Sequence, residues 1–95
     1  MRKDDRARWG LPTERALVSL PAARVVVCFR RRAGISQERL AAEASVDRTE
    51  VGRIERHGKD ARLSTVNALL VALGRTWSEF GAALNVELSA DTRRS

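Results

Sequence analysis

The chain has 95 residues, of which 43% are hydrophobic and 32% charged, and its formal net charge is +6. This length suits one domain with a single core, and no apolar run is long enough to span a bilayer. One cysteine excludes an intrachain disulfide, and the N-terminus lacks a signal-peptide core, so we expect a protein of the cytoplasm without membrane contact. The basic charge favours a polyanionic partner, most simply nucleic acid.

The positive charge is concentrated in the first third of the chain. Residues 1–35 contain nine Lys and Arg against three Asp and Glu, which accounts for the whole excess. We predict that residues 1–18 form a flexible basic N-terminal extension, because their first part is polar and irregular. This extension could act as an arm that reaches phosphates or a minor groove, although a disordered tail is the simpler interpretation.

The first helix of the domain is predicted over Pro21–Ala33. Residues 14–20 could form a separate short helix, which Pro21 would end. Apolar residues then repeat at helical spacing, at Ala22, Val26, Phe29 and Ala33. Gly34 is a suitable stop for this helix.

The second and third helices are separated by a very short break. Ser36 is a plausible cap for the second helix, Gln37–Ala44. Asp47 is expected to cap the third helix, Arg48–Arg56, and Glu50 stands where a capping box needs its acid. Either His57 or Gly58 would close the third helix.

Two further helices complete the predicted domain. Ser64 is expected to cap the fourth, Thr65–Leu73, while Thr76 and Glu79 form a second capping box at the start of the fifth. We expect residues 19–85 to be the folded domain and residues 86–95 a polar C-terminal tail or a short strand. The predicted fold class is therefore all-α, with five helices.

The break after Ala44 is the most informative feature. Two helices joined by two or three residues must cross steeply, and Ala41 is small enough to lie at their contact. Val51 and Ile54 would anchor the third helix to the core. Its opposite face would then project from the domain and fit the major groove of B-DNA, which is about 12 Å wide.

These residues resemble the Cro/phage-repressor-type helix-turn-helix family, also called the XRE family. The resemblance rests on Phe29–Ala41, Val46–Arg56 and the stretch from Leu63 to Gly74, and it covers about residues 20–84. It implies a lambda-repressor-like domain that binds double-stranded DNA. Two positions depart from the family pattern: Ser45 replaces the usual glycine of the turn, and His57 replaces the glycine that commonly ends the recognition helix.

The resemblance also implies roles for individual residues. It assigns contacts with base edges to the exposed face of the third helix, at Arg48, Thr49, Gly52 and Arg53. Contacts with DNA phosphates are expected at Gln37, Lys59 and Arg62. For each of these residues a solvated surface position is the alternative.

Charged residues at the recognition helix have a structural interpretation as well. Asp47 and Glu50 place negative charge at the helix N-terminus, where the helix dipole favours it, and Asp47 could also accept a hydrogen bond from cytosine. The resemblance implies that Arg30 in the first helix pairs with Glu55 at the end of the third. That salt bridge would hold the recognition helix to the core.

The last helix carries more apolar surface than so small a core needs. Part of the surface formed by Trp77, Phe80 and Leu84 is expected to lie in the core, and the rest is predicted to contribute to a two-fold dimer interface. A homodimer would present two recognition helices about 34 Å apart to a palindromic operator.

The functional expectation is a homodimeric transcription regulator that reads a palindromic operator, an autoregulator or repressor of the phage-repressor or restriction–modification controller type. The alternative is an antitoxin or another protein-interaction module, with a toxin or RNA polymerase as partner. An enzyme is not expected, because the sequence has no glycine-rich phosphate loop and its one histidine, His57, has no nucleophile beside it. Neither a cofactor nor a metal site is expected.

Overall fold

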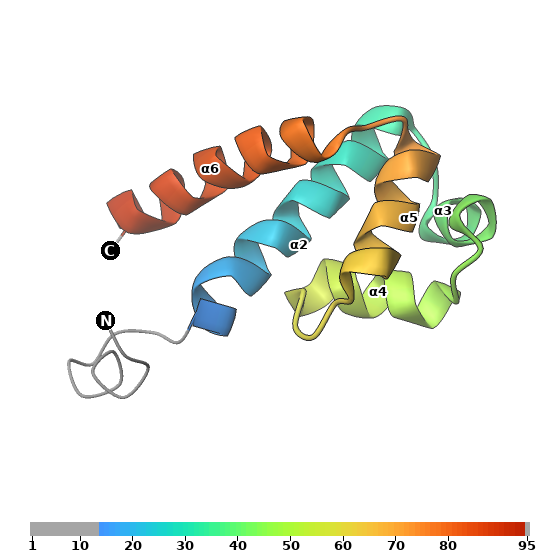
Figure 1. The fold of residues 1–95 in the computed structure, drawn as a ribbon, viewed down its shortest axis with the longest axis horizontal. Coiled ribbons are helices and arrows are strands. Elements are labelled where there is room, and N and C mark those ends of the chain that lie inside the picture. Colours follow the sequence, from blue (N-terminus) through green and yellow to red (C-terminus); the bar gives the residue numbers. More distant parts are fainter. Residues whose placement is uncertain (1–13, 95) are drawn as a thin grey trace.

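The structure is a computed structural model, which describes residues 14–94 and the side chains of residues 18–90. Its elements are α2 (Glu14–Ala33), α3 (Gln37–Ala44), α4 (Arg48–His57), α5 (Leu63–Leu73) and α6 (Trp77–Arg94). No strand occurs among these residues, so the all-α fold class is confirmed (Figure 1). Residues 1–13, most of the predicted basic extension, lie outside the described part.

Helix α2 is longer than predicted, because it continues through Pro21 from Glu14 to Ala33. The prediction that Pro21 separates two helices is wrong. Proline lacks an N–H and cannot donate to the preceding turn, which usually breaks a helix. Here the proline ring is fully buried, and the neighbouring Ala23 and Val25 are each only 2% exposed, so packing against the core compensates for the missing hydrogen bond.

Helix α6 also runs further than predicted. It continues to Arg94, which contradicts the prediction of a tail or strand from residue 86. Figure 1 shows α6 lying alongside α2, and an ion pair between Arg24 and Glu87, with 3.8 Å between nitrogen and oxygen, joins the two helices. The partner helix gives the later turns of α6 a surface to pack on, and tertiary packing supplies most helix stability in proteins.

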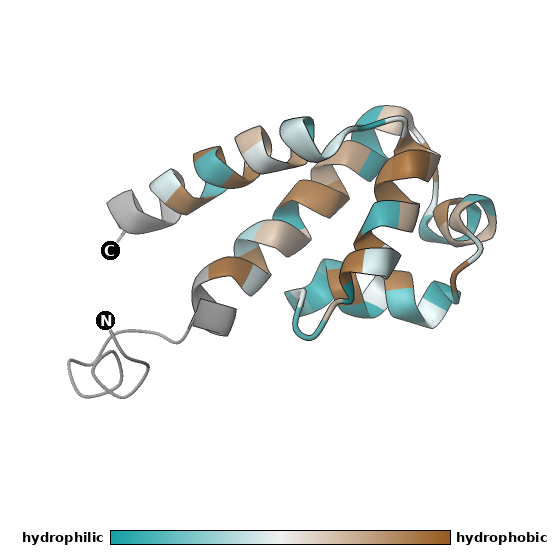
Figure 2. Ribbon diagram, viewed as in Figure 1, coloured by the Kyte–Doolittle hydropathy of each residue, from teal (hydrophilic) through white to brown (hydrophobic). Residues whose placement is uncertain are grey.

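All five helices contribute to one hydrophobic core. Figure 2 shows the hydrophobic residues gathered on the inward faces of the helices. The buried core residues are Val25, Val26, Phe29, Leu40, Ala41, Val51, Ile54, Val66, Leu69, Leu70 and Phe80. Full burial of each large aliphatic or aromatic member stabilises the fold by about 1.5–3 kcal/mol before the entropy cost of ordering it.

Side chains cap α3 and α6 as the sequence indicates. The Ser36 hydroxyl accepts a hydrogen bond from the Arg39 backbone N–H at 3.0 Å. Thr76 and Glu79 form a reciprocal box, in which the Glu79 N–H donates to Thr76 Oγ1 at 3.1 Å and the Thr76 N–H donates to Glu79 Oε1 at 3.0 Å. The Thr76 N–H and, after it, the Arg75 guanidinium lower the pKa of the Glu79 carboxyl.

The start of α5 differs from the prediction. The helix begins at Leu63 instead of Thr65, and its capping position is Arg62, whose side chain makes no capping hydrogen bond. Ser64 therefore lies inside the first turn and is not the cap. Within the described residues, no helix combines the length and the apolar character that crossing a membrane requires.

Candidate nucleic-acid interface

The turn between α3 and α4 brings the two helices together at a steep angle. Ser45 adopts a left-handed conformation with φ 57°, which closes α3 and costs about 1–2 kcal/mol for a residue other than glycine. The Val46 N–H donates to the Ala41 carbonyl at 3.0 Å, and Ala41 itself is 3% exposed. Figure 1 shows α3 nearly end-on while α4 is seen from its side.

Helix α4 is held at both of its ends. At its start, Asp47 Oδ1 accepts a hydrogen bond from the Thr49 N–H at 2.9 Å. Glu50 does not complete a capping box as predicted, because its carboxylate accepts a hydrogen bond from Arg53. At its end, Gly58 is left-handed with φ 65°, and a Cβ added there would overlap the backbone carbonyl of Ser19 on α2.

One face of α4 is anchored and the other is exposed. Val51 and Ile54 are 0% and 1% exposed, so they bind the helix to the core. Arg48 and Thr49 lie on the exposed face near the N-terminal end. The structure thus holds a polar helical surface outward on a rigid support.

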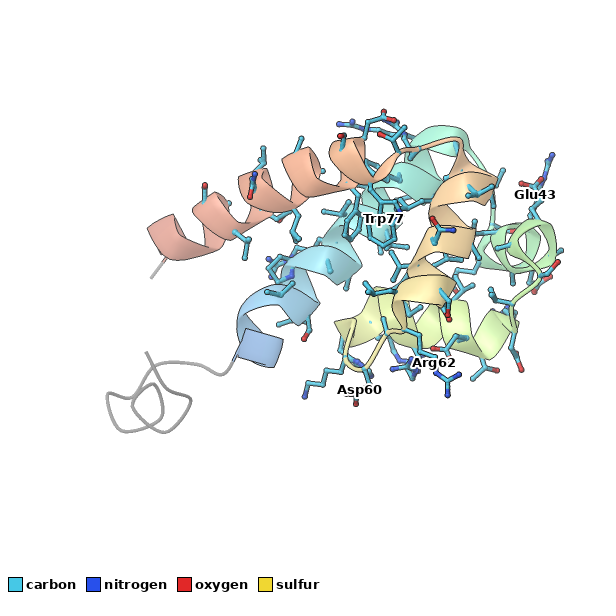
Figure 3. All side chains as sticks on the ribbon, viewed as in Figure 1. Glu43, Asp60, Arg62 and Trp77 are labelled. Carbon is cyan, nitrogen blue, oxygen red and sulfur yellow. The ribbon has the colours of Figure 1, made fainter. Side chains whose placement is uncertain are left out.

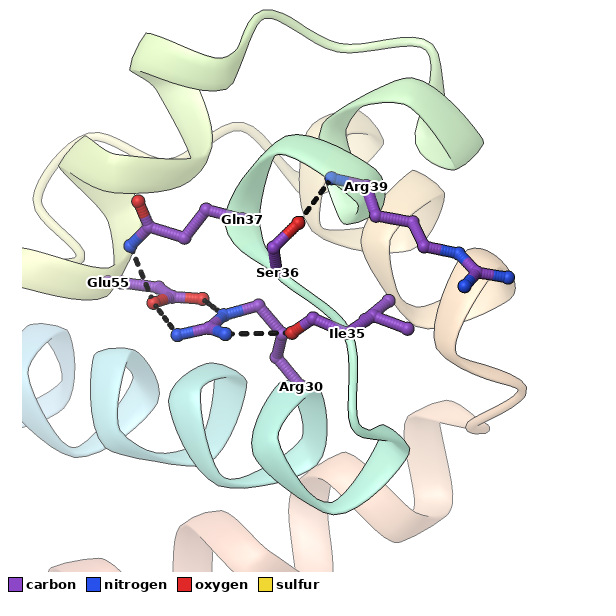
Figure 4. A network of polar contacts seen from close by, with 6 residues as sticks. All are labelled: Arg30, Ile35, Ser36, Gln37, Arg39 and Glu55. Carbon is purple, nitrogen blue, oxygen red and sulfur yellow. Dashed lines mark hydrogen bonds and ion pairs between the residues drawn. The ribbon is translucent and has the colours of Figure 1, made fainter.

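A buried ion pair joins α4 to α2 (Figure 4). Arg30 Nε lies 2.6 Å from Glu55 Oε2, and Arg30 Nη2 lies 3.0 Å from Glu55 Oε1. The two side chains are 14% and 5% exposed. The hydrogen bond from Arg30 to Glu55 raises the pKa of the guanidinium, whereas burial lowers it. A third donor of Arg30 reaches the Ile35 carbonyl at 2.9 Å, so the same side chain also holds the segment before α3.

Gln37 belongs to the same network. Its amide nitrogen donates to Glu55 Oε1 at 2.9 Å, which orients the side chain at the N-terminal end of α3. Its amide oxygen accepts no hydrogen bond from the described residues. Because the N-terminus of a helix presents backbone N–H groups, this corner has the chemistry of a phosphate contact.

Gly52 does not lie on the exposed face of α4, so the prediction that placed it there is wrong. It is buried, and a Cβ added there would lie 3.4 Å from Arg56 Nη1 and 3.8 Å from Gln37 Oε1. Glycine at this position therefore leaves room for two side chains that cross above it. Arg56 is exposed, its side chain approaches the same glycine as that of Gln37, and it was not among the predicted site residues. The sequence did contain a signal for this, because Arg56 follows Gly52 by four residues and therefore lies on the same face of the helix.

The two predicted base-reading arginines differ in their freedom. The Arg48 side chain is 61% exposed, and its Nε lies 3.4 Å from Glu38 Oε1. The Arg53 side chain is 29% exposed and donates to both the Glu50 carboxylate and the Lys59 carbonyl. Arg48 has one exposed carboxylate partner, whereas Arg53 is less exposed and has two partners.

The loop after α4 carries exposed cations. Lys59 and Arg62 are both exposed. Figure 3 labels Arg62 and Asp60 at the same edge of the molecule as α4. No group of His, Cys, Asp and Glu in residues 14–94 could hold a metal ion. The chemistry of this edge is that of hydrogen-bond donors and positive charge.

Two helices joined by three residues, the second anchored by one face and exposed on the other, define a helix-turn-helix domain. A sequence model of the family described as helix-turn-helix matches residues 29–80. The chain belongs to this family, of the XRE type, and it is accordingly a DNA-binding regulator. No curated protein matches the chain in a sequence comparison.

Solved structures with the same fold include the wild-type restriction-modification controller protein C.Esp1396I. One structure of that protein is 26% identical, with a TM-score of 0.73, covering 78% of this chain and 95% of that one. Another is 26% identical with a TM-score of 0.69, covering 76% and 93%. A third, with the same four values, is the tetramer of that protein in complex with its natural 35 base-pair operator.

Proposed function

We propose that this chain regulates transcription by inserting α4 into the major groove of a specific double-stranded DNA site. The observation that carries the proposal is the exposed face of α4, where Arg48 and Thr49 project opposite the buried Val51 and Ile54. A helix held in this way fits a groove about 12 Å wide.

The exposed residues divide into two groups by position. Arg48 is suited to guanine, because a guanidinium can donate to O6 and N7 together, and Thr49 is suited to a thymine methyl group. Arg53 would contact a base as well, once its side chain has left Glu50. Phosphates on either side would be contacted by the set Gln37, Arg56, Lys59 and Arg62. Gly52 is not part of this assignment.

The chain is proposed to act as a homodimer, as a palindromic operator would require. The solved relative bound to its operator is an oligomer, which supports this part of the proposal. Phe80 is not available for a partner, because it is 9% exposed and belongs to the core of the monomer. Leu84 is partly buried against that core, whereas Trp77 is 43% exposed.

The exposed face of α5 is the best surface for this dimer. Residues 63–73 contain no charged residue, although 32% of the whole chain is charged. Leu63 and Val71 are 76% and 70% exposed, and the indole nitrogen of Trp77 donates to Asn67 Oδ1 at 2.8 Å, which extends the same uncharged face. Each copy of the chain carries a net charge of +6, so two copies repel each other least when their uncharged α5 faces pack together.

The likeness to a restriction-modification controller protein favours a small autoregulator that controls a promoter by occupying it. The proposed place of action is the cytoplasm, because a bacterial-type regulator must reach the DNA that it controls. RNA polymerase is a natural partner for such a protein when it is bound beside a promoter.

The proposal is tested by selecting binding sites from a random duplex library and measuring affinity for the selected and a scrambled duplex. Arg48→Ala should weaken binding to the selected duplex by about 5- to 150-fold, equivalent to roughly 1–3 kcal/mol, with little effect on the scrambled duplex. Arg39→Ala, an exposed arginine of α3 that pairs with Glu43, is the control and should leave both affinities nearly unchanged. Failure to enrich any duplex would refute the proposal and favour a protein-interaction module.

A further inference from the structure

Both base-reading arginines are paired with carboxylates of the helix-turn-helix itself. Arg48 on α4 contacts Glu38 on α3, with 3.4 Å between Nε and Oε1. Arg53 contacts Glu50 one turn earlier on α4. Neither carboxylate belongs to the packed core, because the Glu38 side chain is 76% exposed and the Glu50 side chain is 35% exposed.

The helix-turn-helix carries no net positive charge, although the protein is basic. Residues 37–57 contain four arginines against five acidic residues, one of which, Glu55, is neutralised by Arg30 of α2, while the whole chain carries +6. The cations beside this segment, Lys59 and Arg62, lie in the loop after α4. The part of the protein that would touch bases thus contributes no net attraction to a generic polyanion.

The two ion pairs should affect the affinity for random DNA more than the affinity for the specific site. Binding to random DNA depends on cations that neutralise phosphates and release counterions. An arginine that already pairs with a carboxylate gains little by moving to a phosphate, and the carboxylate it leaves behind is repelled by the same backbone.

At the specific site, bases can replace the contacts that the arginine and the carboxylate make with each other. Guanine offers a paired arginine two acceptors in one plane, and a carboxylate next to it can accept a hydrogen bond from the amino group of cytosine. The amino group of adenine can also donate to the carboxylate, so the arginine and the carboxylate are both satisfied only where a guanine and an amino donor lie side by side in the groove. An acid beside each reading arginine therefore opposes random binding more strongly than specific binding.

We infer that Glu38 and Glu50 are specificity-determining residues, which restrain Arg48 and Arg53 and so lower the affinity of the protein for DNA that lacks its site. This inference rests on the proposed DNA-binding function. It assigns to two acids on the binding surface a role other than helix capping, although both also lie in the first turns of their helices.

The test uses Glu38→Gln and Glu50→Gln, which preserve side-chain shape and remove the charge. Glu43→Gln is the matched control, because it makes the same change of net charge on α3 and removes a similar arginine pair, with Arg39 at 2.9 Å. Figure 3 shows Glu43 on the side of α3 away from the edge that carries Arg62. Binding to a random duplex and to the selected duplex is followed by fluorescence anisotropy at several salt concentrations.

We expect each of the two variants to bind the random duplex about three- to tenfold more tightly near 0.1 M salt, with a salt slope steeper by about 0.9, as one added phosphate contact requires. Affinity for the selected duplex should rise less, so that the ratio of the two affinities falls. Glu43→Gln should stay within about twofold of the wild type, because its charge lies away from the DNA.

Three outcomes would overturn the inference. These are unchanged random binding in both variants, an equal gain in Glu43→Gln, or a change in thermal stability without a change in salt slope, which would mean that the acids only cap helices. Glu38→Gln keeps the test valid if Glu50→Gln unfolds, since Glu38 is largely exposed. Absence of duplex binding by the wild type would instead refute the proposed function, so the two failures are distinguishable.

Discussion

Replacing Arg30 with methionine would test whether the buried ion pair holds α4 in place. Methionine keeps the apolar length of the side chain but removes three donors, two to Glu55 and one to the Ile35 carbonyl. The Glu55 carboxylate, which is 5% exposed, would keep only the hydrogen bond from Gln37. A buried charge without its counter-charge costs about 3–5 kcal/mol.

This loss is large relative to the whole stability of the domain. The described part runs from residue 14 to residue 94, and domains of that size unfold with about 4–12 kcal/mol. Arg30→Met should therefore lower Tm by at least about 12 °C, since each kcal/mol shifts the Tm of a small domain by about 4–8 °C. Urea unfolding followed by circular dichroism at neutral pH measures the free energy directly.

Two further variants make the reasoning refutable. Arg39→Met removes an ion pair of similar length, but its two side chains are 68% and 40% exposed, so it should cost less than about 1 kcal/mol. Changing both Arg30 and Glu55 to methionine should recover most of the lost stability, because an apolar pair leaves no buried charge. If Arg30→Met costs no more than the control, or if the double variant is merely additive, the ion pair does not have the assigned role.

Three other predictions follow from the packing. Gly58→Ala should destabilise the fold by about 2 kcal/mol or more in urea, because the left-handed backbone is strained and the new methyl group meets the Ser19 carbonyl; a loss below about 0.5 kcal/mol would contradict this contact. Val71→Glu should give a monomer in sedimentation velocity, whereas Val86→Glu, an equally exposed valine (65%) on α6, should leave the dimer intact; the reverse result would place the interface on α6. Because the pKa of Glu79 is lowered in the folded chain, its stabilising contribution is present above its unfolded pKa of about 4.3 and is lost as the pH falls through the folded value. The difference in unfolding free energy between the wild type and Glu79→Gln should therefore vanish in acid, and a difference that is the same at pH 7 and pH 2 would refute the assignment.

Much of the fold follows from local sequence. Ser36, Thr76 and Glu79 cap helices in the structure because capping depends on groups within three residues of each other. The burial of Val51 and Ile54 follows from helical spacing, which puts residues three apart on one face. The same spacing identifies Arg48 as an exposed residue before any coordinates are known.

Burial of particular faces was decided by the tertiary structure. Periodicity assigned Gly52 to the face of Arg48, but the side chains of Gln37 and Arg56 cover it. The apolar excess of the last helix led to the prediction that Phe80 contributes to a partner surface, although the monomer encloses it.

The sequence by itself determined where α3, α4 and α6 begin, that Val51 and Ile54 face the core, and that a helix-turn-helix lies between residues 37 and 57. Only the tertiary structure decided that α2 passes through Pro21, that α6 extends to Arg94 along α2, and that Glu38 of α3 pairs with Arg48 of α4. The reason is physical: capping and periodicity act within a few residues, whereas the burial of a face and the partner of a charge depend on which distant segment packs against it.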